Sequence, residues 1–221
     1  MKLNNKRTIL VGLAFLSICA FWQMYDSIVP LILTKTFHMN ETFSGAIMAA
    51  DNILALFLLP FFGSVSDKSH SKLGKRMPFI LFGTGCAIIL MNILPLLDNS
   101  YAAQPSGFKT ASFVIVLGLL LVAMGTYRAP AVALMPDVTP KPLRSRANAI
   151  INLMGAVGGI LYLGVAAVLY PNSKTAGLDH VNYQPLFIVV SAIMFVAVAV
   201  LFLTIREPKL TAENQALEKQ H

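Results

Sequence analysis

Six long runs of apolar residues constrain the fold of this chain more than any other feature of its sequence. An α-helix needs about 20 apolar residues to cross the hydrocarbon core of a bilayer. The runs that meet this requirement are residues 9–33, 43–62, 78–97, 111–135, 147–170 and 185–205. No segment has the alternating polarity that is typical of barrel strands. The sequence therefore predicts an all-α membrane protein with six transmembrane helices.

The low content of charged residues agrees with an environment of lipid. Only 12% of the 221 residues are charged and 56% are hydrophobic, whereas soluble domains have about 25% charged residues. A net charge of +7 would by itself suggest nucleic acid as a partner. The basic residues, however, lie in short segments between the apolar runs, as topology determinants do. We expect the lipid bilayer as a partner and no nucleic acid.

The distribution of lysine and arginine among these segments predicts the orientation of the helices, because cytoplasmic loops hold the excess. One side has Lys2, Lys6, Arg7, Lys68, Lys72, Lys75, Arg76, Lys141, Arg144, Arg146, Arg206, Lys209 and Lys219. The other side has Lys35, Lys109 and Lys174. We expect both termini in the cytoplasm and a multi-pass protein of the plasma membrane. Residues 1–205 form the predicted transmembrane domain, and residues 206–221 form a polar cytoplasmic tail or a linker.

The segment between the second and third apolar runs contains a recognisable motif. Residues 63–68 read GSVSDK and residues 74–79 read GKRMPF. This resembles the signature loop of the major facilitator superfamily, in which a small residue, an acid and a basic cluster join the second and third helices. The longer gap between the acid and the second glycine is similar to the branch that holds sucrose and other glycoside–cation symporters. Residues 128–137 and 144–149 resemble the same branch at its fourth and fifth helices.

The resemblance covers the whole chain but only half of the usual fold, in which two six-helix halves enclose a central site. It implies the amino-terminal half, a 3+3 helix bundle. The implied function is secondary active transport of a saccharide or similar small polar solute by alternating access. H⁺ or Na⁺ would be the coupling cation, with no other cofactor. A second half would come from a lost part of the same chain, a separate chain or a homodimer. The alternative is a non-transporting subunit or a truncated half-transporter without independent activity.

Small and charged residues of these motifs are candidates for a conformational latch. An acid and a basic cluster at helix ends can pair across one face of the bundle and change partners between two conformations. A plain positive loop would explain the basic residues but not the glycines or the acid. The candidates are Gly63, Asp67, Lys68, Gly74, Lys75, Arg76, Asp137, Arg144 and Arg146.

Three ionisable residues, Asp26, Asp51 and Arg128, fall inside the apolar runs. A charge in hydrocarbon costs about 3 kcal/mol or more near the centre of a helix, so each is a functional hypothesis. The helical rise puts the two acids at similar depth and Arg128 nearer the cytoplasm. We expect these residues to couple transport to a cation, and we favour Asp51 over Asp26. The alternative is a fixed ion pair that only orients helices.

Aromatic and amide side chains in the same runs suit a saccharide, because aromatic faces cover sugar C–H surfaces and amides bind hydroxyls. The candidates for substrate binding are Trp22, Gln23, Tyr25, Asn52, Tyr127 and Asn152. As alternatives, tryptophan and tyrosine anchor helices at the membrane interface, and polar residues form hydrogen bonds between helices.

The histidines argue against an enzyme. His38, His70, His180 and His221 all lie in predicted loops or in the tail. The sequence therefore offers no intramembrane Ser–His dyad and no histidine metal site. It also has no Walker-type phosphate loop. We expect no enzymatic activity, no catalytic residue and no metal site.

Glycines at helical spacing in the fifth apolar run predict a close helix contact. Gly155 and Gly159 are four residues apart, and Gly158 lies between them. Small residues at this spacing let two helix backbones approach closely in a membrane. We expect this run to pack tightly on a neighbouring helix.

Overall fold

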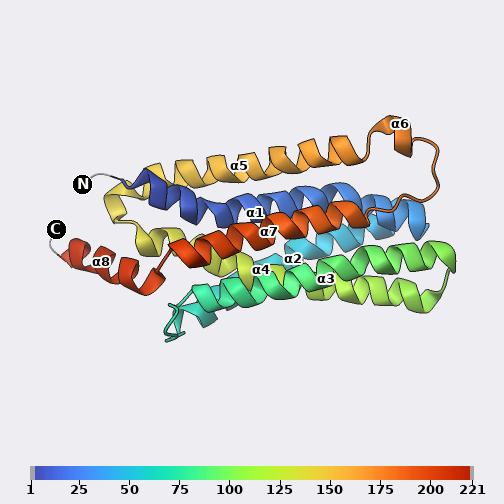
Figure 1. Ribbon diagram of the computed structural model, residues 1–221. Helices are drawn as coiled ribbons and strands as arrows, with labels where there is room; N and C mark the ends of the chain where they lie inside the picture. Colours follow the sequence, from blue (N-terminus) through green and yellow to red (C-terminus); the bar gives the residue numbers. More distant parts are fainter. Residues whose placement is uncertain (1–2, 220–221) are drawn as a thin grey trace.

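The computed structural model describes residues 3–219, which form a bundle of six long helices (Figure 1). These are α1 (Asn5–Leu31), which continues as the π-helical η1 (Ile32–Thr36), α2 (Glu41–Asp67), α3 (Met77–Ala103), α4 (Gly107–Val138), α5 (Arg144–Leu169) and α7 (Gln184–Thr204). Shorter elements are η2 (Lys141–Leu143), α6 (Asn172–Thr175) and α8 (Glu207–Lys219). All six long helices are apolar enough to cross a membrane, and residues 3–219 contain no strand. The predicted fold class is confirmed. Lys2, used for the orientation, and tail residues 220 and 221 lie outside the described residues.

Two helices, α1 and α2, begin before the apolar runs with asparagine side chains that cap them. The Asn4 side chain accepts a hydrogen bond from the Arg7 backbone N–H at 3.0 Å. Asn40 accepts one from the Phe43 N–H at 2.8 Å. Such caps satisfy donors that have no partner within the first turn of a helix. The helices therefore start in polar sequence that hydrophobicity alone does not mark.

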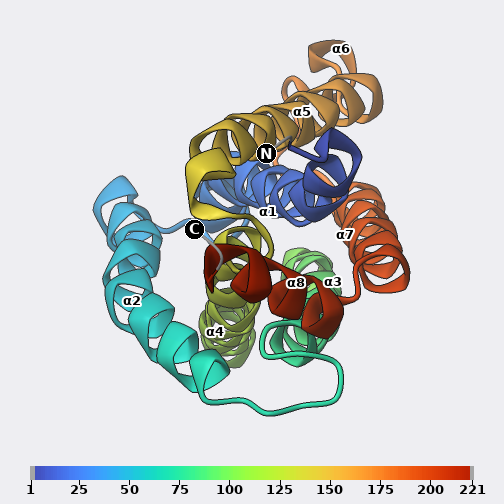
Figure 2. The same cartoon turned by 90° about the vertical axis from the view of Figure 1, so that its left-hand side faces the viewer.

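The packing of the helices reveals an internal repeat. Helix α1 packs on α5 and α7, helix α4 packs on α2 and α3, and α3 packs on α7. Exchanging α1, α2 and α3 for α4, α5 and α7 leaves this set of neighbours unchanged. An end-on view shows α5 beside α1 and α2 beside α4 (Figure 2). The bundle is therefore two related three-helix units, the predicted 3+3 arrangement.

Helices α1 and α5 approach most closely at Gly155 and Gly158. A Cβ atom on Gly155 would lie 2.9 Å from the Cys19 Sγ, and one on Gly158 would overlap the backbone carbonyl of Leu16. A side chain at Gly158 requires movement of the α1 backbone, whereas one at Gly155 requires the Cys19 side chain to move. The predicted glycine contact is confirmed, and its closest point is Gly158; the nearest atom to a Cβ on Gly159 would be the Gln23 Oε1 at 3.9 Å.

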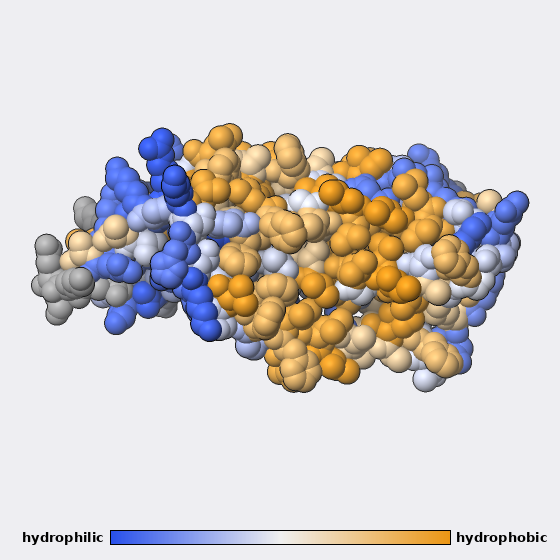
Figure 3. Space-filling model, turned by 90° about the horizontal axis from the view of Figure 1, so that it is seen from below, coloured by the Kyte–Doolittle hydropathy of each residue, from blue (hydrophilic) through white to orange (hydrophobic). Residues whose placement is uncertain are grey.

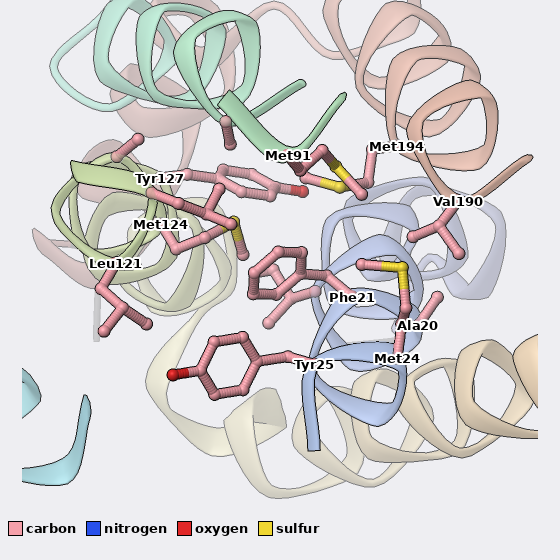
Figure 4. Close-up of a cluster of buried hydrophobic side chains, with 14 of the residues drawn as sticks. Ala20, Phe21, Met24, Tyr25, Met91, Leu121, Met124, Tyr127, Val190 and Met194 are labelled. Carbon is pink, nitrogen blue, oxygen red and sulfur yellow. The ribbon is translucent and has the colours of Figure 1, made fainter. Parts of the chain in front are cut away.

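Methionine and aromatic side chains fill the core between the helices (Figure 4). The rings of Phe21 and Tyr25 stack with their centroids 6.0 Å apart. Methionine adapts its shape to irregular gaps between such rings. The fully buried methionines in this region are Met24, Met91, Met124 and Met194.

The surface of the bundle has an apolar band between two hydrophilic ends (Figure 3). Helix α2 contributes the most exposed part, since its most apolar 18-residue stretch has no buried residue. Leu56 and Phe57 on this helix are 70% and 67% exposed. Apolar exposure on this scale requires lipid or another helix bundle as a cover.

Candidate functional site

Asp51, Trp22 and Arg128 come together where α1, α2 and α4 meet. They line one cavity of about 20 Å³, whose other walls are mainly leucines. That volume is enough for about one water molecule. The guanidinium carbon of Arg128 lies 5.7 Å from the centroid of the Trp22 ring. A cation over an aromatic face is stabilised by the ring quadrupole, so the indole helps to hold the Arg128 charge within the bundle.

The two acids of the apolar runs lie on this same side of the bundle. Asp51 is half-buried, Asp26 is exposed, and the two are close enough to interact electrostatically. Asp51 also interacts with the charge of Arg128 and accepts a hydrogen bond from the Asn52 side-chain amide at 2.8 Å. Within residues 3–219, no acid lies within 4 Å of Arg128. The three ionisable groups therefore share one region without a fixed ion pair.

The predicted substrate residues differ in how far they are buried. Asn52 and Asn152 are exposed, and Gln23 is half-buried against α5. Trp22 and Tyr25 each bury a polar atom, the indole N–H and the phenol hydroxyl, that has no hydrogen-bond partner among the described residues. Unsatisfied buried donors are rare in folded proteins and call for an explanation.

Tyr127, the sixth candidate for substrate binding, lies in the core of the bundle instead of at its surface. Its hydroxyl is 2.5 Å from the Ser17 Oγ and donates to the Ala14 carbonyl at 3.1 Å. Its side chain is fully buried. In this conformation Tyr127 therefore links α4 to α1, and a contact with substrate stays a prediction.

A second charged site surrounds Arg76 at the end of the bundle where the chain begins and ends, called here the terminal end. The Arg76 guanidinium donates to the Asp137 carboxylate at 2.8 Å and to the Ser66 hydroxyl at 2.5 Å. It also pairs with the Asp67 carboxylate and donates to the Gly63 carbonyl at 3.4 Å. Arg76 thus joins the ends of α2, α3 and α4.

The charge of Arg76 persists although the residue is only 6% exposed. Burial lowers the pKa of its guanidinium, but the hydrogen bonds and charges of Asp137 and Asp67 raise it by more. The net shift in the pKa of Arg76 is upward, so the two carboxylates stabilise the charged form of the guanidinium.

Glu207 completes this site and was missed by the sequence analysis. Its carboxylate accepts hydrogen bonds from the backbone N–H groups of Lys75, Arg76 and Met77 at 2.8–3.1 Å. An acid at the start of α8 therefore caps the first turn of α3. Gly74 has a φ of +115° and lies against Glu207, where a Cβ would overlap the carboxylate. The sequence contains one signal for this contact: Glu207 is an acid directly after the last apolar run, at the same end of the predicted helices as the basic loop.

The remaining latch candidates lie outside the Arg76 contacts. Arg144 donates to the carbonyls of Pro136 and Thr139 at 2.9 and 3.1 Å. These hydrogen bonds give partners to carbonyl groups at the end of α4. The side chains of Lys68, Lys75 and Arg146 are exposed. The structure therefore gathers Gly63, Asp67, Arg76 and Asp137 into one network, with Gly74 and the Lys75 backbone held by Glu207.

The chain belongs to the Major Facilitator Superfamily, whose sequence model matches residues 11–220. It is similar to "Sucrose transport protein SUC3" of Arabidopsis thaliana, with 35% identity over 158 residues that cover 66% of this chain and 26% of the relative. It is 36% identical over 154 residues to "Sucrose transport protein SUT3" of Oryza sativa subsp. indica, covering 63% of this chain and 30% of the relative.

A human relative is more distant but is matched over more of the chain. "Solute carrier family 45 member 3" of Homo sapiens is 25% identical over 186 residues, which cover 82% of this chain and 34% of the relative. The matches thus span about a quarter to a third of the length of these relatives. The family and its sucrose-transporter-like half are confirmed, as is the prediction that the chain is not an enzyme.

Proposed function

We propose that this chain is one six-helix half of a saccharide–cation symporter that works by alternating access. The observation that carries the proposal is that Asp26, Asp51 and Arg128 share one side of the bundle with Trp22. An acid that water reaches from one side of the membrane at a time can bind and release a coupling cation, H⁺ or Na⁺. The names of the relatives, sucrose transport proteins, support a saccharide as the solute.

Asp51 is the proposed coupling residue because it interacts electrostatically with both Asp26 and Arg128. Cation binding to Asp51 removes its attraction for Arg128 and its repulsion of Asp26, so the balance among the three groups changes with occupancy. The Trp22 ring offers an apolar face to sugar C–H groups. Asn52 and Asn152 offer amides to sugar hydroxyls.

A second six-helix half is the proposed cover for the polar side of the bundle. Asp26, Asn52 and Asn152 have exposed side chains within membrane-spanning helices, and lipid is a costly neighbour for such groups. A half supplied by the same protein, a separate chain or a second copy would enclose a solute site between the two halves. The excess of lysine and arginine at the terminal end supports cytoplasmic termini in a plasma-membrane protein.

The Arg76 network is the proposed latch at the cytoplasmic end. It ties α2, α3 and α4 together, and Glu207 adds α8 to the same assembly. Charge networks of this kind are bistable because each acid can exchange one donor for another. One conformation would keep these contacts and the other would break them.

The test is uptake of labelled sucrose into proteoliposomes, with and without an imposed proton or sodium gradient. We expect gradient-driven accumulation by the chain assembled with a second half, and its loss in Asp51→Asn, which removes the exchangeable acid. Glu41→Gln is the matched control, because Glu41 is an exposed acid at the start of the same helix. Undiminished accumulation by Asp51→Asn would show that coupling does not use this residue.

The second candidate is a non-transporting subunit or a half without independent activity. Absence of uptake in every oligomeric form of the chain would support this candidate over the symporter.

A further inference from the structure

A buried acid lies at the end of the bundle opposite the Arg76 network, called here the distal end. Asp98, in the last turns of α3, is 0% exposed, and neither carboxylate oxygen has a hydrogen bond of ordinary geometry within residues 3–219, although the Thr36 hydroxyl lies close enough to stabilise the ionised form. The Nδ1 atom of His180 lies 3.9 Å from the Asp98 Oδ1. His180 belongs to the connection between α5 and α7, residues 170–183. An ionised carboxylate without a donor is strongly disfavoured at such a position.

The hydrogen bonds around His180 assign the proton on one of its ring nitrogens. Asn182 Oδ1 accepts from the Gln184 backbone N–H at 3.0 Å and from the Asn99 side-chain amide at 2.9 Å. This orients Asn99 so that its carbonyl oxygen faces the His180 Nε2 at 2.9 Å. A carbonyl oxygen only accepts, so Nε2 carries a hydrogen.

The other ring nitrogen, Nδ1, is therefore the position where a proton can bind or leave. It faces the Thr36 hydroxyl at 3.2 Å as well as the Asp98 carboxylate. With the proton present, an imidazolium faces the acid and the pair is neutral. Without it, the Thr36 hydroxyl can donate either to Nδ1 or to the Asp98 carboxylate, and the Asp98 charge stays buried with no cation beside it.

We propose that Asp98 and His180 form a proton-binding site that fastens the α5–α7 connection to the ends of α1 and α3. The bond that forms is N–H at Nδ1 of the imidazole, and water supplies and receives the proton. When the connection is fastened, the buried Asp98 charge stabilises the proton on His180. Opening exposes Asp98 to water, which weakens this stabilisation, so the open form binds the proton less tightly. Loss of the proton therefore favours opening.

Other titratable groups also lie at the distal end. They are Lys35 and His38 after α1, Glu41 at the start of α2, Tyr101 on α3, Lys109 on α4, and Tyr170, Lys174, Asp179 and Tyr183 in the connection or at its ends. Within the described part of the chain, no lysine and no other histidine of this set pairs with Asp98, and neither Glu41 nor Asp179 pairs with His180. Lys109 instead donates to the carbonyls of Ser100 and Gln104 at 2.8 Å.

The neighbouring tyrosines stay neutral over the relevant range. Burial, and then the charge of Asp98, raises the pKa of Tyr183, and burial raises the pKa of Tyr170. The tyrosines therefore add no charge beside the Asp98–His180 pair near neutrality. The site keeps the connection fastened while its proton is bound, and it releases the connection when the pH rises and the proton leaves.

The test is hydrogen–deuterium exchange of the full chain in lipid nanodiscs at pH 5.5 and pH 8.5, corrected for the intrinsic rate of amide exchange at each pH. We expect the protection of amides 176–183 to fall at least tenfold at the higher pH. Asp98→Asn, a neutral isostere, should keep these amides protected at both pH values. His180→Gln should remove the pH dependence as well. His38→Gln is the control, because His38 is an exposed histidine at the same end, and it should behave as the unmodified chain does.

Two results would overturn the proposal. One is equal protection of the unmodified chain at both pH values. The other is a pH dependence that persists in Asp98→Asn, which would mean that the acid is permanently protonated. If Asp98→Asn does not fold, His180→Gln decides, because a retained pH dependence there excludes the site and a lost one supports it. The test does not involve transport, so its outcome is separate from that of the uptake experiment.

Discussion

At the scale of single residues, Glu207 has the strongest local effect that the structure reveals at the terminal end. Its carboxylate is 2% exposed and lies on the first turn of a different helix, 130 residues away in sequence from Met77. The backbone N–H groups of Lys75 and Arg76, just before α3, and of Met77, its first residue, all donate to this one side chain. Arg76, one residue before α3, is held by the same contacts and by its two acids.

Glu207→Gln should destabilise the protein by about 1–3 kcal/mol, because the amide places a donor against backbone donors and removes the negative charge at a helix start. Thermal unfolding in detergent micelles measures this as a lower Tm. The matched control is Glu213→Gln, on the same helix, whose side chain is 51% exposed and pairs with Lys209 at 3.9 Å. A change within about 0.5 kcal/mol is expected there. Equal shifts in the two variants would contradict the capping role.

At the scale of helices, the contact between α1 and α5 fixes the relation of the two three-helix units. The backbone of α1 fits against Gly158 without space for a Cβ, and the Cys19 side chain lies against Gly155. In a bilayer, close packing of this kind replaces the hydrophobic effect as the main source of helix association.

Gly158→Ala should therefore lower the stability by about 1–3 kcal/mol through overpacking against α1. Gly164→Ala is the matched control on the same helix, since nothing lies within 4 Å of the added Cβ. Alanine has the higher helix propensity, so the control should be neutral or slightly stabilising. Thermal unfolding of both variants in the same detergent compares them. A Gly158→Ala variant as stable as the Gly164→Ala variant would disprove the close contact.

The sequence predicts the helices well and their contacts poorly, for physical reasons. A run such as residues 185–205 can do little in a membrane except span it as a helix, so its prediction needs only local sequence. Glu207, by contrast, acts on residues that are distant along the chain, and no local pattern marks such a pair. Tyr127 shows the same limit: its polarity suggested a substrate contact, but its rotation about α4 turns the hydroxyl toward Ser17. Asp51 and Arg128 were found because charge within hydrocarbon is conspicuous in any context.

At the scale of the whole molecule, the central claim is that one side of the bundle faces water inside the membrane. Asp26, Asn52 and Asn152 are exposed within membrane-spanning helices, as is Phe195 of α7, which is 65% exposed. Lipid suits Phe195, whereas in the proposed function the polar groups line an aqueous pathway between two halves.

The most direct measurement is the reaction of single cysteines with a membrane-impermeant thiol reagent in whole membranes, in a background without Cys19 and Cys86. Asn52→Cys and Asn152→Cys test the polar side, and Phe195→Cys tests the lipid side. We predict rapid labelling of the first two variants, slowed by added saccharide, and no labelling of the third. Protection of Asn52→Cys and Asn152→Cys to the same degree as Phe195→Cys would place the charged residues against lipid and contradict a transport pathway on this side of the bundle.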